Sequence, residues 1–349
     1  MQINDIPLLF ELTPQLIKLF ALAVAGFGFA MALTPVYTYA AYRYRFWKKQ
    51  RSTATTGELL SVFNKLHEKK FERNIPTMAG LIALVVVVII TVAANLDRQQ
   101  TWLPLAAFFG GGVVGLIDDI INIRGKGGGV GGLRSSVKFA LITLIALVAA
   151  WFFYTKLGYT DIHIPFVGAL EIGWLIIPLF VLVVVSTSNA VNISDGLDGL
   201  AGGLLAMSFG VFGVIALLQG NLGIAGFCFT VVGVLLSYIW FNIYPARFFM
   251  GDVGSFAYGS ALGVVAMLTD TMFLLPIIGF VFVLEGGSSL IQIVSKKFFK
   301  RKVFISAPIH HHFEALGWPE TKVTMRFWVI GQITGIVGLL IALSGGHIT

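Results

Sequence analysis

The stretch Asn189-Ala-Val-Asn-Ile-Ser-Asp-Gly-Leu-Asp-Gly199 lies between two long apolar runs, at 175–185 and 200–218. Runs of this kind are typical of helices that cross a membrane, which need about 20 mostly apolar residues. Carboxylates, amides and glycines therefore sit where one such helix ends and the next begins. Asp195 and Asp198 are three residues apart, so a single turn puts both side chains on one face. We interpret this loop as the floor of an active site at the cytoplasmic face of a membrane.

The composition of the 349-residue chain indicates a polytopic membrane protein. Hydrophobic residues make up 57% of it and charged residues only 12%, whereas a soluble domain carries about 25% charged residues. The single cysteine, Cys228, lies in an apolar run, which excludes a disulfide framework and a cysteine metal site. We expect one integral membrane domain over residues 1–349, all-α in class, whose first apolar segment is retained rather than cleaved.

Hydropathy predicts about ten transmembrane helices. The segment 157–172 alternates and contains turn residues, which predicts a small external β-hairpin. In the segment 272–296, Gly286 and Gly287 are expected to weaken the helix and allow a bend. The predicted spans are 15–41, 77–96, 102–121, 136–155, 173–190, 198–218, 222–243, 253–269, 272–296 and 327–345.

Lysine and arginine residues set the predicted orientation, because the loops that carry them stay on the cytoplasmic side. Of the 24 lysines and arginines, all but Lys18, Arg98 and Lys156 fall in alternate loops or at their edges. The side that carries most of the lysines and arginines is therefore predicted to be cytoplasmic, and ten spans place both termini outside. The net charge of +7 follows from this membrane topology, so nucleic acid is not an expected partner.

Five of the aspartates fall at predicted cytoplasmic helix ends, where carboxylates close to hydrocarbon are energetically costly. Adjacent carboxylates repel each other unless a cation intervenes, so we expect Asp118 and Asp119 to have different partners. Asp252 is expected to be the N-cap of the helix that follows it. A divalent cation shared with phosphates explains the cluster, because Mg²⁺ takes oxygen ligands. The five residues are Asp118, Asp119, Asp195, Asp198 and Asp252.

Three other features carry polar or aromatic side chains towards this region. The three histidines of Ala307-Pro-Ile-His-His-His312 cannot all face one zinc ion in regular structure, but they can donate hydrogen bonds to phosphate or shuttle a proton. Glu285 lies roughly 18 Å from the outer end of its predicted span, as either a functional group or a packed structural residue. Phe248 and Phe249 either stack on a nucleobase or lie at the membrane interface.

Together these motifs resemble the polyprenyl-phosphate N-acetylhexosamine-1-phosphate transferases. The resemblance covers residues 76–328 and implies transfer of phospho-MurNAc-pentapeptide from UDP-MurNAc-pentapeptide to undecaprenyl phosphate. The products are lipid I and UMP, the pathway is peptidoglycan synthesis, and the cofactor is Mg²⁺. The resemblance also implies a homodimer in the bacterial inner membrane. The matching motifs are Ile117-Asp-Asp119, Asn189 to Gly199, Phe249-Met-Gly-Asp-Val-Gly-Ser255 and Ala307-Pro-Ile-His-His-His-Phe-Glu-Ala-Leu-Gly-Trp-Pro-Glu320.

The resemblance assigns a role to each matching residue. Asp252 matches a magnesium ligand, and Asn192 matches a second one. Asp118 is either the base for the lipid phosphate or a nucleophile that forms a covalent phospho-sugar intermediate, and Asp119 positions metal or phosphate. His310, His311 and His312 complete the catalytic set. The matching substrate positions are Lys70, Lys138, Asn192, Asp195, Gly196, Leu197, Asp198, Asn242, Phe249 and Gln292.

The first loop departs from the family pattern. Asn74-Ile-Pro-Thr-Met-Ala-Gly80 stands where the family has Gly-Thr-Pro-Thr-Met-Gly-Gly, so either Lys70 or Arg73 is the nucleotide-contacting cation. Phe249 matches the position that stacks on uracil.

Two other functions remain open. A sister enzyme that uses UDP-GlcNAc shares the acidic motifs but lacks the contiguous triple histidine. A transporter predicts charges along a path through the bilayer, where only Glu285 is clearly deep.

Overall fold

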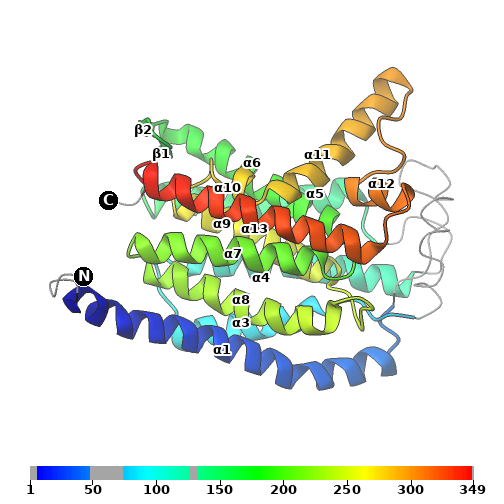
Figure 1. Cartoon of the computed structure of the whole chain (residues 1–349), viewed down its shortest axis with the longest axis horizontal. Helices are drawn as coiled ribbons and strands as arrows, with labels where there is room; N and C mark the ends of the chain where they lie inside the picture. The colour runs from blue at the N-terminus through cyan, green and yellow to red at the C-terminus, as the bar shows by residue number, and fades with distance from the viewer. Residues whose placement is uncertain (1–5, 48–73, 126–131, 348–349) are drawn as a thin grey trace.

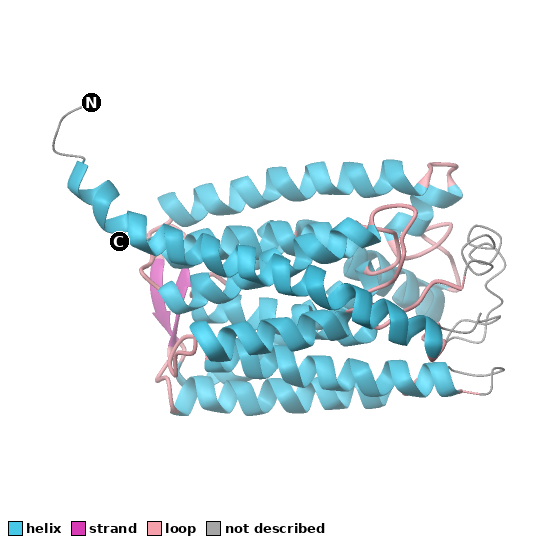
Figure 2. Cartoon of the chain, turned by 90° about the horizontal axis from the view of Figure 1, so that it is seen from below, coloured by secondary structure: helices cyan, strands magenta, loops and turns pink. Residues whose placement is uncertain are grey.

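The computed structural model describes residues 6–47, 74–125 and 132–347, and these form a bundle of long helices that run side by side (Figure 1). The start of α1, the end of α13 and the β-hairpin lie at one end of the bundle, and the end of α1 and the helix α12 lie at the other (Figure 1, Figure 2). The elements are α1 (Ile6–Arg43), α3 (Gly80–Ala94), α4 (Trp102–Arg124), α5 (Ser135–Thr155), β1 (Asp161–Ile164), β2 (Gly168–Glu171), a 3-10 turn (Gly173–Leu175), α6 (Ile176–Ser194), α7 (Leu200–Leu218), α8 (Leu222–Asn242), α9 (Gly251–Leu268), α10 (Leu275–Ile278), α11 (Phe280–Val294), a π-helical turn (Ser295–Phe299), α12 (Ile309–Ala315) and α13 (Glu320–Ser344).

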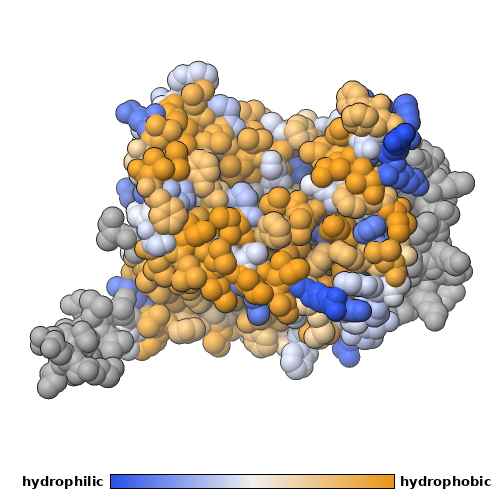
Figure 3. Space-filling view, turned by 45° about the horizontal axis from the view of Figure 1, so that its top comes forward, coloured by the Kyte–Doolittle hydropathy of each residue, from blue (hydrophilic) through white to orange (hydrophobic). Residues whose placement is uncertain are grey.

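Eight helices in the described ranges are long and apolar enough to cross a membrane. The predicted span at 77–96 is the shorter apolar helix α3, of 15 residues, and the predicted span at 272–296 is divided into α10 and α11. Hydrophobic residues cover most of the visible middle of the molecule (Figure 3). Exposed apolar side chains of the described helices include Val24 and Trp240, which are 70% and 69% exposed. An apolar surface of this extent fits contact with lipid. The prediction of an all-α polytopic membrane protein is confirmed.

The helix expected at 272–296 breaks at a different place from the one predicted. Gly286 and Gly287 lie inside the continuous helix α11, whereas the break is at Gly279, between α10 and α11. The Gly279 N–H closes the turn by donating to the Leu275 carbonyl oxygen at 2.8 Å. Pro276 lies at the start of α10, where its missing N–H is tolerated. Gly286 instead gives room for packing, since it faces Ala190 of α6.

The predicted hairpin is confirmed and is fastened to the bundle. β1 and β2 pair antiparallel, with Asp161 opposite Glu171 and Ile164 opposite Gly168. The His163 N–H donates to the Asp270 Oδ1 at 2.9 Å, and the His163 Nε2 lies 2.8 Å from the Gly345 carbonyl oxygen. The hairpin therefore ties the turn after α9 to the end of α13.

Helix α9 occupies the centre of the bundle, and all of its residues except Asp252 are buried. Its sequence contains Gly254, Ala257 and Ala261 among other small residues, which let helix backbones approach closely in membranes. The closest approach is to α4. A Cβ on Gly115 would collide with the backbone carbonyl of Asp252. Glycine at this position therefore brings the acidic end of α4 against the first turn of α9.

We expect Gly115→Ala to destabilise the bundle by about 1–3 kcal/mol, because the added methyl group overpacks the contact between α4 and α9. Thermal unfolding of the purified protein in detergent measures this as a lowered midpoint. Gly210→Ala on α7 is the matched control, because a Cβ there has nothing within 4 Å and alanine favours the helix. Equal midpoints for the two variants would contradict the close approach.

Candidate active site

Three aspartates meet where α4 ends and α9 begins. Carboxylate oxygens of Asp118, Asp119 and Asp252 lie within 4.8 Å of one another. Asp118 and Asp119 are 1% and 0% exposed, and the Asp252 side chain is 13% exposed. The prediction that Asp252 is the N-cap of its helix is wrong. Met250 is the N-cap, and Asp252 is the second helical residue, with its carboxylate near those of the other two acids.

Gly251 is the reason for this offset. Its φ of +75° is in the left-handed region that glycine adopts without strain, and a Cβ there would meet Asp119 Oδ2 at 2.5 Å and Thr77 Oγ1 at 2.9 Å. The chain therefore turns into α9 two residues earlier than predicted, and the Val253 N–H donates to Asp119 Oδ2 at 3.1 Å. The first turn of α9 thus supplies both an acid and a donor to the site.

Asp118 has different partners from Asp119, as expected. The Leu133 N–H donates to Asp118 Oδ1 at 2.6 Å. Lys138, in the first turn of α5, places its Nζ 3.4 Å from Asp118 Oδ2 and 3.0 Å from Asp252 Oδ2. The ammonium group offsets part of the repulsion between these two carboxylates.

Three carboxylates and one ammonium group leave the centre with excess negative charge and several oxygen donors. Hard divalent cations prefer this donor chemistry, so Asp118, Asp119 and Asp252 fit a metal ion. Asn192, the predicted second ligand, lies beside the centre. Its Nδ2 donates to Ser255 Oγ at 2.8 Å, one turn after Asp252 on α9. The amide of Asn192 therefore borders the first turn of α9.

The predicted substrate residues Asp198 and Asn242 fasten two loops together. Asp198 is 2% exposed, and its Oδ2 accepts a hydrogen bond from the Ala246 N–H at 3.0 Å. Asn242 is 3% exposed; its Oδ1 accepts from the Gly199 N–H at 2.9 Å, and its Nδ2 donates to the Phe248 carbonyl at 2.8 Å. The loop after α6 is thereby held against the loop after α8. A direct contact of either residue with substrate stays a prediction.

The start of α13 supports the same loop. The Asp198 N–H donates to Glu320 Oε1 at 2.6 Å, and Trp328 Nε1 donates to the Gly199 carbonyl at 3.2 Å. Leu197, immediately before Asp198, is 3% exposed. Sequence reasoning noted Glu320 only as the end of the histidine motif, because no local pattern shows which distant backbone amide a carboxylate will meet.

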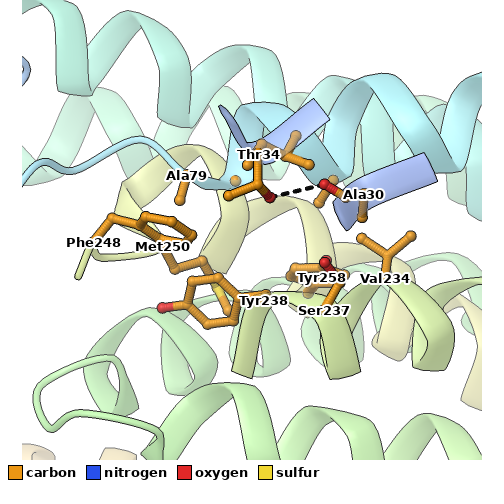
Figure 4. Close-up of a pocket in the computed structure, with 12 residues that line it drawn as sticks. Ala30, Thr34, Ala79, Val234, Ser237, Tyr238, Phe248, Met250 and Tyr258 are labelled. Atoms are coloured by element: carbon orange, nitrogen blue, oxygen red, sulfur yellow. Dashed lines mark hydrogen bonds between the residues drawn. The ribbon is translucent and has the colours of Figure 1, made fainter. Parts of the chain in front are cut away.

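The two neighbouring phenylalanines have different surroundings. Phe248 is 2% exposed and lies with Tyr238 and Met250 around a small pocket between α1, α3, α8 and α9 (Figure 4). Phe249 is partly exposed, and its backbone is held by the first-loop motif, with Phe249 N–H donating to the Pro76 carbonyl at 2.8 Å. Of the two residues, only Phe249 is therefore partly exposed, as stacking on a nucleobase requires. Lys70 and Arg73 lie outside the described residues.

Each histidine of the triple run has its own partner, as expected for consecutive helical residues. The Nδ1 atoms of His310 and His311 lie 2.7 Å from Glu285 Oε2 and from Glu314 Oε2, respectively. His312 Nδ1 accepts from the Ile305 N–H at 3.2 Å. Burial of His311, followed by the nearby His310, lowers the pKa of His311 to about 4. His311 is therefore neutral at pH 7.

Glu285 is the partner that sequence reasoning missed. It is 0% exposed, like His310, and it reaches His310 from 25 positions earlier in the chain. The Nε2 edge of the His310 ring lies against Gly196, where a Cβ would collide with His310 Nε2. Because a carboxylate on Nδ1 fixes the orientation and tautomer of an imidazole, Glu285 positions His310 against the loop after α6.

Gln292 holds the segment that leads to the histidines. Its Oε1 accepts from the N–H groups of Val303 and Phe304, both at 3.0 Å, and its Nε2 donates to the Phe304 carbonyl at 2.9 Å. Gln292 is 6% exposed. Its predicted contact with phosphate or sugar stays a prediction.

The separate motifs form one continuous region at one end of the bundle. Helix α6 and its loop provide the link, because Asn192 contacts Ser255 beside the acidic centre and Gly196, four residues later, contacts His310. Asp195, the C-cap residue of α6, lies between these two positions in the chain. The fold and the site thus define a polytopic membrane protein with an acidic, metal-compatible centre bordered by lysine, histidine and an accessible aromatic ring.

Comparison with known proteins narrows this class. Residues 101–270 match the family described as Glycosyl transferase family 4. The phospho-N-acetylmuramoyl-pentapeptide-transferase of Chloroflexus aggregans is 39% identical, over 96% of this chain and 92% of the relative. The protein of the same name from Geobacillus thermodenitrificans is 37% identical, over 94% of this chain and 98% of the relative. The chain belongs to the phospho-N-acetylmuramoyl-pentapeptide-transferase family, which confirms the resemblance seen in the motifs.

We expect Glu285→Ala to lower transferase turnover by about 10–100-fold, the usual effect of losing a carboxylate that orients a functional histidine. Glu285→Gln should retain more activity, since its amide oxygen can still accept from Nδ1. Steady-state kinetics should report the loss in kcat more than in KM for the nucleotide substrate. Glu171→Gln on the exposed hairpin is the control. Equal activities for Glu285→Ala and the control would remove Glu285 from the positioning of His310.

Proposed function

We propose that this protein transfers phospho-MurNAc-pentapeptide from UDP-MurNAc-pentapeptide to undecaprenyl phosphate, giving lipid I and UMP for peptidoglycan synthesis. Family membership supports the reaction class. The observation that carries the proposal is the meeting of Asp118, Asp119 and Asp252 with Lys138 at one end of a membrane bundle. A water-soluble diphosphate and a lipid phosphate can both reach a site only where cytosol meets lipid.

The donor is proposed to bind across the loops after α6 and α8. Uracil stacks on the accessible ring of Phe249, beside a loop that Asp198 and Asn242 hold in place. The diphosphate extends from there towards the acidic centre, and the sugar lies near His310, which contacts Gly196 of the same loop. Asp195, between Asn192 and Gly196, faces the path between these subsites.

Asp252 with Asn192 is proposed to hold Mg²⁺ together with Asp118 or Asp119. When bound, Mg²⁺ neutralises charge on the diphosphate and so favours attack by a second anion. Lys138 adds a fixed positive charge at the same place, 3.0 Å from Asp252, which stabilises the extra negative charge that develops in the transition state.

Asp118 is proposed to carry the chemical step, by one of two routes. In the first route it accepts the proton of the lipid phosphate, which then attacks the sugar-bearing phosphorus and releases UMP. In the second route Asp118 itself attacks that phosphorus and releases UMP, and the lipid phosphate then displaces the Asp118 carboxylate to take the phospho-sugar. Its hydrogen bonds from Leu133 and Lys138 hold the carboxylate in one orientation, which either route requires.

The polyprenyl chain is proposed to lie in an apolar groove of about 450 Å³ beside α6, α10 and α11. The groove includes Leu182, Ala190 and Leu290 and extends along α6 to Ile193, the residue after Asn192. A lipid phosphate can therefore reach the centre without leaving the membrane. Glu285 also no longer favours a transporter, because it is paired with His310 at this site.

The remaining parts of the proposal concern the surroundings of the protein. The site is proposed to face the cytoplasm of a bacterial cell, with both termini outside the inner membrane and two copies forming a homodimer. The start of α1 and the end of α13 lie at the end of the bundle opposite α12, which supports this orientation (Figure 1).

We expect Asp252→Ala to reduce UMP release by at least about 100-fold, because it removes a metal-ligand carboxylate. The assay uses purified protein, undecaprenyl phosphate, MgCl₂ and either UDP-MurNAc-pentapeptide or UDP-GlcNAc. Asp161→Ala on the exposed hairpin should leave the rate unchanged. UMP release from UDP-GlcNAc but not from the muramoyl donor would replace the proposed reaction with that of the sister enzyme.

We expect Asp118→Asn to lose turnover while nucleotide binding largely survives, because the amide keeps the shape of the side chain but neither accepts a proton nor attacks phosphorus. Calorimetric titration with the donor measures binding, and UMP release measures turnover. Full turnover in this variant would remove Asp118 from both proposed routes.

A further inference from the structure

A second apolar groove lies far from the acidic centre, between the beginning of α4 and the end of α5. It has a volume of about 770 Å³, and its lining includes Leu103, Ala106, Gly110, Val148 and Phe152. Trp102, the first residue of α4, precedes Asp118 by sixteen residues. This separation is about 24 Å along the helix. The chain continues from α5 into β1, so the groove is at the hairpin end of the bundle (Figure 2).

One cation lines this groove, and a second lies one helical turn beyond its lining on α5. Arg98 is its charged lining residue, and Lys156 follows the lining residue Phe152 by one helical turn, on the same face of α5. Only Lys18, Arg98 and Lys156 of the 24 basic residues fall on this side of the predicted topology. Because cations are uncommon on the non-cytoplasmic side, two of three at one groove require a specific reason.

Two tryptophans place the mouth at the depth of lipid headgroups. Trp102 lines the groove and is 50% exposed, and Trp151 is 54% exposed. The Lys156 Nζ lies 5.9 Å from the centre of the Trp151 ring. Exposed tryptophans concentrate at the interface between membrane and water, so Arg98 and Lys156 lie where phosphate groups of lipids lie.

The groove then extends into the hydrocarbon. From Trp102 to Gly110 it follows α4 for about 12 Å, close to the roughly 15 Å half-thickness of the bilayer core. At Gly110 the two helices come together, since a Cβ there would meet Ile145 at 3.2 Å. The groove thus has the length of one leaflet, with an apolar interior and a cationic mouth.

We propose that this groove is a binding site for an anionic phospholipid of the non-cytoplasmic leaflet. One acyl chain fills the space between α4 and α5, and the phosphate lies between Arg98 and Lys156. Arginine suits this role because its planar guanidinium forms paired hydrogen bonds with phosphate oxygens. The site is separate from the proposed groove for the polyprenyl substrate, which lies beside α6, α10 and α11.

Native mass spectrometry of the delipidated full-length protein tests the charge requirement. Phosphatidylglycerol should bind at least about fivefold more tightly than phosphatidylcholine with the same acyl chains. Arg98→Gln and Lys156→Gln should each weaken phosphatidylglycerol binding by about fivefold and leave phosphatidylcholine binding unchanged. Lys18→Gln, which removes the third cation of this side, is the matched control. Equal effects of all three variants, or none, would overturn the proposed headgroup contact.

A filling variant tests the position of the acyl chain. Ala106 is an exposed lining residue, so Ala106→Phe should reduce the bound fraction of both lipids severalfold. Ala93→Phe on the exposed face of α3 is the control. Size-exclusion elution reports folding, and Ala106→Leu replaces Ala106→Phe if that variant aggregates. Undiminished lipid binding by a correctly folded Ala106→Phe or Ala106→Leu variant would overturn the proposed binding site.

Discussion

The contact between the backbones of α4 and α9 is the constraint on which the site depends. Because Gly115 lacks a side chain, α4 lies directly against the Asp252 carbonyl, and the carboxylates of Asp118, Asp119 and Asp252 are drawn within 4.8 Å. Such a cluster repels itself in a low-dielectric interior. The Leu133 and Val253 N–H groups and the Lys138 ammonium group reduce this cost. The remaining negative charge makes the centre suitable for a cation and for substrates that bring one.

Around this centre, polar side chains that the motifs mark as functional also hold the loops in place. Asp198 and Asn242 are almost completely buried, and their hydrogen bonds join the loops after α6 and α8. Buried polar groups are nearly always hydrogen-bonded, so these loops are fixed by a few specific contacts. Glu285 acts similarly on His310. Loss of activity on changing such residues therefore reflects the position of loops and rings as much as direct contact with substrate.

The two ends of the molecule have different chemistry. At one end lie the acidic centre, the triple histidine run and most of the basic residues that the structure describes. At the other end lie the hairpin and a small number of cations, of which Arg98 lines an apolar groove. The proposed reaction takes place at the first end, whereas the second end offers a place where the surrounding lipid can be held. This separation follows from the topology of the spans, since alternate loops lie on opposite sides of the bundle.

The sequence by itself determined the membrane class, the hairpin and the approximate helices, because apolar runs and alternating patterns are local signals. Its motifs also determined the family and marked Asp118, Asp119 and Asp252 as the acidic centre. Only the tertiary structure decided how these residues meet. The pairing of Glu285 with His310, the helix break at Gly279 and the offset of Asp252 from the N-cap depend on contacts or turns that local pattern does not specify. The distinction between buried Phe248 and accessible Phe249 likewise required the packed bundle, because adjacent residues of one type carry no sequence signal for which ring is buried.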